Sequence, residues 1–222
     1  MNSREREKVL ERVAQKIADS AKNHPLKVAI DGVDAAGKTY FSMEVRTILE
    51  NLGYNVIQAS IDGFHNPREV RYRRGRENPE GYYYDSFNYS ALKRYLLNPL
   101  EPKGDRLYRT KVFDYQKDAC LDTEFETALE NTILLFDGVF LPRPELNHMW
   151  DLRIFLDISF EESLKRGVNR DEGNRLDKIK LYSTRYIPGQ KLYFNEVNPR
   201  KLAEIVIWNT EINNPEIAFI KE

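Results

Sequence analysis

One short stretch sets the strongest constraint on how this chain can fold. Residues 32–39 read Gly-Val-Asp-Ala-Ala-Gly-Lys-Thr, which fits the pattern G-x-x-x-x-G-K-[ST] of a phosphate-binding loop, or P-loop. The apolar run at residues 26–30 predicts a buried strand before it, and apolar residues at helical spacing in 40–52 predict a helix after it. Strand, glycine-containing loop and helix are the context in which this motif binds a nucleoside triphosphate.

The residue types of the loop match the chemistry of a triphosphate. Glycine lets the backbone approach a phosphate without an intervening Cβ, which applies to Gly32 and Gly37. Backbone N–H groups and the start of the helix add partial positive charge. We expect ATP as the nucleotide, with Lys38 on its β- and γ-phosphates and Thr39 holding Mg²⁺. The predicted nucleotide-binding residues are Gly32, Val33, Asp34, Ala35, Ala36, Gly37, Lys38, Thr39 and Tyr40.

Length and composition limit the classes of protein and partner. The 222 residues suit one domain, so we expect 1–222 to form a single domain. The net charge of −1 does not indicate a strongly charged partner such as DNA. The single cysteine, Cys120, cannot form an internal disulfide and suits a reducing compartment. Without a membrane-length apolar run or a secretory segment, the sequence predicts a cytoplasmic protein with no membrane partner. The oligomeric state stays open, a homo-oligomer included.

Two further apolar runs each end in a carboxylate. Residues 54–61 predict a strand that leads into Asp62, and residues 131–136 predict a strand that ends at Asp137. In a parallel sheet the carboxyl ends of the strands meet at the ligand crevice. Asp62 could accept the proton of an attacking hydroxyl there, or it could only begin a turn. Asp137 is expected to hold Mg²⁺ together with Thr39.

Residues 65–85 mix arginine, tyrosine, proline and glycine without a sustained period. A structureless segment of this length is often functional. It could bind single-stranded nucleic acid, grip a nucleoside or sugar phosphate, or lie as a solvated loop whose tyrosines pack on the domain. For His65 alone the last interpretation is favoured. Beyond this segment, helical spacing returns at 86–97, and residues 107–115 and 119–123 predict a hairpin over the crevice.

The C-terminal third predicts a helical lid. A helix that begins at Ser159 carries Arg166 and Arg170. Residues 171–175 interrupt this helix, and a second helix over 176–186 is expected to end before Pro188. Basic residues on such a lid could act on a γ-phosphate, although charged runs more often form a solvated helix face.

The remaining segments complete an α/β pattern. The sequence predicts an amphipathic helix over 3–22, a buried strand over 152–158 and a last strand over 205–208. The tail from Asn213 is expected to be peripheral.

Together these features resemble the uridine kinase family, from about Leu26 to Trp208. That family belongs to a group of P-loop kinases that includes phosphoribulokinase and bacterial pantothenate kinase. The features that carry the resemblance are the P-loop, Asp62, Tyr84-Asp85, Val112-Phe113-Asp114-Tyr115, Asp137-Gly138, and the helix with Arg166 and Arg170.

The resemblance implies a role for each of these residues. Asp62 would be the catalytic base and would face the acceptor. Tyr84 and Asp85 would hold the ribose hydroxyls, and Phe113 would lie against the base. The lid arginines, Arg166 and Arg170, would contact phosphates and ribose and, with Lys38, complete the catalytic set.

Three departures from the family pattern concern the acceptor and the loop. Tyr40 follows Gly-Lys-Thr where the family usually has Gly-Lys-Ser-Thr, so Thr39 alone would serve the metal. The hairpin lacks the histidine that typically helps to read the pyrimidine, and the arginine-rich stretch 68–76 is not typical.

The sequence therefore predicts a three-layer α/β fold with a mainly parallel sheet, a helical lid and a small β-hairpin over the site. The predicted activity is transfer of the γ-phosphoryl group of ATP to a small-molecule hydroxyl, with the 5′-hydroxyl of uridine or cytidine as first choice. Alternatives are another acceptor (pantothenate, a sugar phosphate or another nucleoside) or a P-loop nucleic-acid-binding or regulatory protein.

Overall fold

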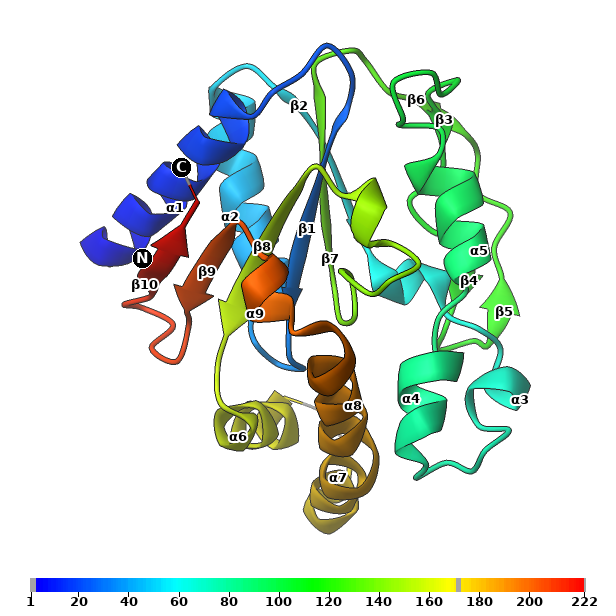
Figure 1. The fold of residues 1–222 in the computed structure, drawn as a ribbon. Helices are drawn as coiled ribbons and strands as arrows, with labels where there is room; N and C mark the ends of the chain where they lie inside the picture. The colour runs from blue at the N-terminus through cyan, green and yellow to red at the C-terminus, as the bar shows by residue number, and fades with distance from the viewer. Residues whose placement is uncertain (1–2, 171–172, 222) are drawn as a thin grey trace.

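The computed structural model describes residues 3–170 and 173–221. At its centre lies a six-stranded sheet with the strand order β10-β9-β8-β1-β7-β2 (Figure 1). The strands are β1 (Leu26–Gly32), β2 (Asn55–Ser60), β7 (Thr132–Gly138), β8 (Leu152–Asp157), β9 (Ile205–Trp208) and β10 (Glu216–Ile220). All neighbouring pairs are parallel except β9 with β10, so the predicted mainly parallel sheet is confirmed.

Strand β10 corrects one expectation. The tail beyond Asn213 is not merely peripheral, because Glu216–Ile220 pairs antiparallel with β9 and forms the edge of the sheet. Its side chains are mostly exposed or half-buried, so the segment lacks the apolar run that announces an interior strand.

The two faces of the sheet carry separate hydrophobic clusters. Val28 and Ile30 of β1 point into one cluster, whereas Ala29 between them points into the other. Helices α1 (Arg4–Asp19) and α2 (Lys38–Asn51) cover the first face (Figure 1). The other face is covered by α4 (Pro79–Asp85), α5 (Tyr89–Leu92), its continuation η2 (Lys93–Leu97) and α8 (Ile187–Val197). Helix, sheet and helix form the expected three layers.

The sequence predicted a structureless segment at residues 65–85, but this prediction is wrong, because the segment contains two short helices. A single turn, η1 (Ile61–Phe64), leads into α3 (Arg68–Arg71), and α4 follows. Asn78 caps α4 by accepting a 2.8 Å hydrogen bond from the N–H of Gly81, and Pro79 occupies the first turn. Both helices are too short to show a helical period, so only the capping residues marked α4 in the sequence.

The predicted hairpin is present but its ladders are short. Strand β4 (Phe113–Asp114) pairs with β5 (Ala119–Cys120), and β3 (Leu107–Tyr108) pairs with β6 (Glu126–Thr127). The carboxylate of Asp114 accepts the N–H groups of Gln116 and Lys117 and so closes the tight turn.

The lid consists of α6 (Phe160–Arg170), α7 (Arg175–Leu181), η4 (Tyr182–Tyr186) and α8. The Ser159 hydroxyl accepts the N–H of Glu162 at 3.1 Å, as a helix cap should. Of the predicted break at 171–175, residues 171–172 lie outside the described residues. The predicted end before Pro188 is wrong: the wider turn of η4 precedes the proline, whose missing N–H is tolerated in the first turn of α8.

In the part of the chain that the structure describes, no helix has the length and apolar character needed to cross a membrane.

Candidate active site

The P-loop joins the end of β1 to the start of α2, and two glycines permit its conformation. Gly37 has a φ of 89°, in the left-handed region that favours glycine. A Cβ at Gly32 would lie 2.6 Å from the carbonyl oxygen of Leu156 on the neighbouring strand β8. A side chain at Gly32 would therefore push the loop away from β8, and a side chain at Gly37 would strain the backbone.

Lys38 is held inside the loop. Its Nζ donates hydrogen bonds to the carbonyl oxygens of Gly32 at 3.0 Å and Val33 at 2.8 Å. Burial lowers the pKa of Lys38, while the carboxylates of Asp34 and Asp31 act in the opposite direction. An ammonium group held by neutral carbonyls can exchange them for the charged oxygens of a phosphate.

Three oxygen-bearing side chains converge at the ends of β2, β7 and α2. The hydroxyl of Thr39 donates to Oδ2 of Asp137 at 2.9 Å, and the hydroxyl of Ser60 donates to the same oxygen at 3.3 Å. Burial raises the pKa of Asp137, opposed by the Thr39 hydrogen bond and the charge of Lys38. A nearby cation would favour the ionised carboxylate.

This oxygen set fits Mg²⁺, which prefers oxygen ligands and usually keeps few protein ligands beside phosphate and water. Among residues 3–170 and 173–221, no group of three or more His, Cys, Asp or Glu side chains could hold a metal ion by itself. An ion at Thr39 and Asp137 would therefore need phosphate oxygens as well.

A cleft of about 540 Å³ lies elsewhere, between the lid and Arg76–Glu77, but the predicted chemistry gathers in a smaller one of ≈ 310 Å³. The smaller cleft lies at the carboxyl ends of β1, β2 and β7, where a parallel sheet places its ligands. Its lining includes the predicted site residues Asp34, Ala35, Lys38, Thr39, Asp62, Asp137 and Arg170. Its lining also includes six aromatic or imidazole side chains: His65, Tyr82, Phe87, Tyr115, Tyr182 and Tyr186.

Asp62 projects from η1 into this cleft, with a side chain that is 66% exposed. The Nδ1 of His65 lies 4.0 Å from Oδ1 of Asp62 and 3.0 Å from the carbonyl oxygen of Asp62. An exposed carboxylate in the same cleft as Lys38 and Thr39 has the chemistry that a general base needs.

His65 is a cleft residue that the sequence interpretation missed. Its ring stacks on Tyr115 of the hairpin, with centroids 5.2 Å apart, and packs against Phe87 at 4.6 Å. Burial lowers the pKa of His65 and so favours its neutral form, although the charge of Asp62 acts against this. The available signal was its place three residues after Asp62 at the end of a strand.

Comparison with known proteins agrees with this geometry. No protein-family model matches the chain. A uridine kinase from Chlamydia pneumoniae is 25% identical over 183 residues, which span 81% of this chain and 80% of the relative. The structure of a possible uridine kinase from Bacillus stearothermophilus superposes with a TM-score of 0.73 at 21% identity, covering 89% of this chain and 96% of that one. The chain is therefore similar in sequence and in fold to P-loop kinases of the uridine kinase type.

The relatives leave the acceptor of this kinase open. A thymidylate kinase from Mesoplasma florum is 27% identical over 206 residues, which span 86% of this chain and 90% of the relative. The shared feature of these proteins is phosphoryl transfer, so the comparisons support a phosphotransferase.

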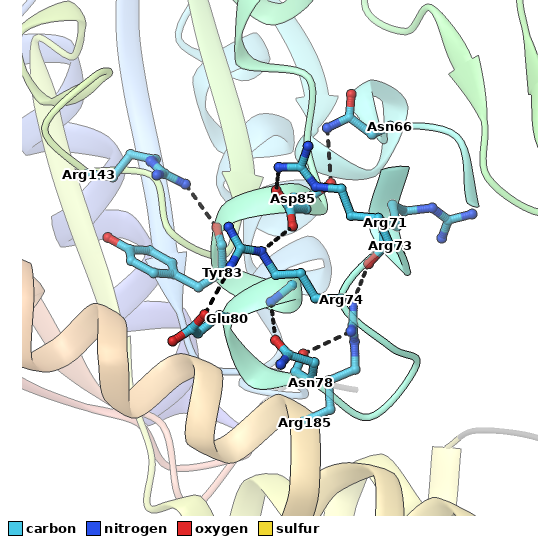
Figure 2. Close-up of polar contacts among 11 residues, drawn as sticks. Asn66, Arg71, Arg73, Arg74, Asn78, Glu80, Tyr83, Asp85, Arg143 and Arg185 are labelled. Atoms are coloured by element: carbon cyan, nitrogen blue, oxygen red, sulfur yellow. Dashed lines mark hydrogen bonds and ion pairs between the residues drawn. The ribbon is translucent and has the colours of Figure 1, made fainter. Parts of the chain in front are cut away.

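Three residues that the resemblance assigned to the acceptor do not line the cleft of this kinase. Tyr84 is 45% exposed and lies outside the cleft lining. The side chain of Phe113 is only 5% exposed, and the hairpin residue that lines the cleft is Tyr115. Asp85 is buried at the end of α4 and forms ion pairs with Arg73 and with Arg74, the latter at 2.9 Å (Figure 2). Burial alone would raise the pKa of Asp85, but the hydrogen bonds from both arginines hold it below its usual value.

The two predicted lid arginines also lie in different places. Arg170 lines the cleft. Arg166 does not: its Nη2 donates to the carbonyl oxygens of Asn209 at 2.9 Å and Thr210 at 2.7 Å, just after β9. Its Nε donates to Glu162 at 2.8 Å. Arg166 therefore ties α6 to the segment that follows the last parallel strand.

The arginine-rich stretch contacts the protein itself. Beyond the pairs with Asp85, Arg71 bonds to Asp118 at 3.0 Å and Arg74 bonds to Glu80 at 3.1 Å. From the lid, the buried guanidinium of Arg185 reaches three backbone carbonyls of this segment (Figure 2). They belong to Asn78 at 3.0 Å, Arg76 at 3.2 Å and Arg71 at 3.3 Å.

Proposed function

We propose that this kinase transfers the γ-phosphoryl group of ATP to the 5′-hydroxyl of uridine or cytidine. The observation that carries the proposal is the composition of one cleft. Lys38, Asp62 and the Thr39–Asp137 pair lie at its phosphate end, and flat side chains such as His65 and Tyr115 form its wall. Aromatic faces suit a planar base, and the relatives named uridine kinase support the same acceptor.

Each side chain has a distinct part in the proposed reaction. Asp62 accepts the proton of the attacking hydroxyl, and Lys38 moves from the loop carbonyls to the transferring phosphoryl group. Arg170, on the lid, adds positive charge once the cleft closes and water leaves. Thr39 and Asp137 would hold Mg²⁺, which neutralises phosphate charge when bound.

The arginine contacts favour a neutral acceptor over an anionic one. Arg71, Arg73 and Arg74 already bind carboxylates of the protein, and an acceptor phosphate would have to displace those partners. The same contacts weaken the alternative in which this stretch binds nucleic acid, because phosphate binding needs uncommitted basic side chains.

The proposal extends to the setting of the enzyme. We propose that residues 1–222 act as one kinase domain in the cytoplasm, where the exposed thiol of Cys120 would stay reduced.

The test is a panel of acceptors with Mg·ATP. We expect the highest kcat/KM with uridine or cytidine, a lower value with 2′-deoxyuridine, and no effect of added RNA on turnover. Thymidine monophosphate, pantothenate and ribulose 5-phosphate represent the anionic acceptors. Turnover with one of these three and none with uridine would overturn the nucleoside assignment and leave the kinase assignment standing.

A further inference from the structure

One residue of the P-loop touches three elements that frame the cleft. The N–H of Asp34 donates to Oε1 of Gln190 on α8 at 2.8 Å. The carbonyl oxygen of Asp34 accepts a 2.7 Å hydrogen bond from the hydroxyl of Ser163 on α6. Both carboxylate oxygens accept from the hydroxyl of Tyr82 on α4, each at 3.0 Å. The nucleotide loop is thus bonded to both ends of the lid and to Tyr82, which belongs to the aromatic lining of the cleft, here called the acceptor wall.

The partners of Asp34 are themselves fixed. The ring of Tyr82 packs edge-on against Phe140 at 5.1 Å and Tyr186 at 4.9 Å, and the guanidinium of Arg185 lies 5.5 Å from its centroid. Gln190 is 1% exposed, and its Nε2 donates to Oδ2 of Asp34 at 3.1 Å and to the carbonyl oxygen of Tyr186 at 3.0 Å. A displacement of α4 or α8 therefore cannot leave Asp34 in place without breaking these bonds.

A negatively charged side chain such as Asp34 is unexpected in a loop that binds a triphosphate. A carboxylate facing the phosphates would repel them. In this structure it faces Tyr82 and Gln190, whose donors satisfy it. Burial raises the pKa of Asp34, with Lys38 acting in the opposite direction, so the loop depends on these donors to keep the carboxylate where it is.

We propose that Asp34 is a positioning residue that couples the nucleotide loop to the acceptor wall and the lid, so that bound ATP and bound acceptor strengthen each other's binding. A nucleotide that orders the loop fixes Asp34, and Asp34 in turn fixes Tyr82 and Gln190. Linkage requires that the acceptor raise ATP affinity by the same factor. The acceptor arm of the test rests on the proposed nucleoside function, and the nucleotide arm does not.

The first experiment measures the coupling by calorimetry. The dissociation constant of Mg·AMP-PNP is determined with and without saturating uridine, in wild type, Tyr82→Phe, Asp34→Ala and Tyr83→Phe. Tyr83→Phe is the matched control, because its hydroxyl makes no hydrogen bond to the P-loop in the described part of the chain. The coupling ratio is the dissociation constant of Mg·AMP-PNP without uridine divided by the constant with uridine. We expect this ratio to be about five or more in wild type and in Tyr83→Phe, and near one in the other two variants.

This ratio separates coupling from direct contact. If Tyr82 only touched uridine, Tyr82→Phe would weaken uridine binding equally with and without nucleotide, and the AMP-PNP ratio would not change. In the Asp34→Ala background, Tyr82→Phe should have no further effect on the ratio. A ratio of one in wild type, or independent effects of the two substitutions, would overturn the proposal.

The second experiment needs no acceptor. Hydrogen exchange of residues 79–85 and 187–197 is followed with and without Mg·AMP-PNP. We expect nucleotide to slow exchange of both segments in wild type and Tyr83→Phe, and not in Tyr82→Phe for residues 79–85. Failure of uridine to bind would refute the nucleoside function alone, whereas unchanged exchange in wild type would refute the coupling.

Discussion

The hydroxyl of Thr39 donates a 2.9 Å hydrogen bond to Oδ2 of Asp137, which joins the first turn of α2 to the end of β7. The register of the sheet makes this contact possible, because Ile30 of β1 pairs with Asp137, and Ser60 of β2 pairs with it from the other side. The P-loop and the carboxyl ends of β2 and β7 thus lie at the same level of the sheet. Residues far apart in the chain form one phosphate end of the cleft.

Lys38→Ala should nearly abolish phosphoryl transfer. Losing one preorganised electrostatic partner of the transferring group lowers kcat by about 10²–10³-fold. Lys165→Ala, at an exposed position of α6, is the control and should keep normal kinetics. Thermal unfolding should show that Lys38→Ala stays folded, and near-normal turnover in that folded variant would refute the role assigned to the P-loop.

Asp62→Asn should reduce kcat and leave nucleotide affinity nearly unchanged. The amide keeps the shape of the side chain but cannot take a proton, and general-base help is worth about 10²–10⁴-fold. Steady-state kinetics with calorimetry of Mg·AMP-PNP binding separates the two effects. Loss of nucleotide binding with unchanged kcat would place Asp62 in the metal site instead.

Arg170→Ala should lower activity, whereas Arg166→Ala should lower stability. Arg170 lines the cleft, so its loss should lower kcat more than it weakens acceptor binding. Arg166 bonds to the carbonyls of Asn209 and Thr210, so its loss should reduce the free energy of unfolding by about 1–3 kcal/mol. Urea denaturation and kinetics on both variants test this, and equal kinetic defects with unchanged stability would return Arg166 to the catalytic set.

The sequence predicted the phosphate end of the cleft far better than its acceptor end. Lys38, Thr39, Asp62 and Asp137 are each marked by a local pattern, a glycine loop or an apolar strand that ends in a carboxylate, and the sheet alone brings them together. Their catalytic and metal-binding roles stay predictions.

The acceptor end depends on contacts that no local pattern encodes. Asp85 is withdrawn from the cleft by arginines from the preceding turn, which the sequence showed only as a basic stretch. The hairpin turns Phe113 inward and Tyr115 toward His65, a choice set by the register of two-residue ladders. Short elements with few hydrogen bonds leave weak sequence signals.

Asp31→Asn should change how stability depends on pH. The buried carboxylate of Asp31 accepts a 2.6 Å hydrogen bond from Tyr193, and burial raises its pKa from 3.8 to about 6. The folded protein therefore holds this proton more tightly than the unfolded chain does. The protonated Asp31 carboxyl increases the free energy of unfolding, and this contribution is fully present below pH 3.8 and is lost as the pH rises to about 6. The loss amounts to at most about 3 kcal/mol.

Urea denaturation of wild type and Asp31→Asn between about pH 4 and pH 8 checks this prediction. The stability of Asp31→Asn relative to wild type should increase with pH across the interval between the two pKa values and then level off. Parallel pH profiles for the two proteins would show that Asp31 does not titrate in this range.

The final prediction identifies the side chain that contacts the acceptor base. Tyr115 lines the cleft and stacks on His65, whereas Phe113 is 5% exposed within the hairpin. Stacking of a base on an aromatic ring is worth about 1–3 kcal/mol, so Tyr115→Ala should raise the KM for uridine by about 5- to 150-fold. Tyr115→Phe keeps the ring and should stay near wild type.

Phe113→Leu provides the contrast, because it keeps an apolar side chain in the hairpin and removes the ring that the family resemblance placed against the base. We expect it to lower the unfolding temperature by a few degrees, since a buried side chain is replaced by one that fills its site less well. Its KM for uridine should change little. A larger rise in KM for Phe113→Leu than for Tyr115→Ala, at unchanged unfolding temperature, would mean that the hairpin rearranges on binding and that Phe113 meets the base after all.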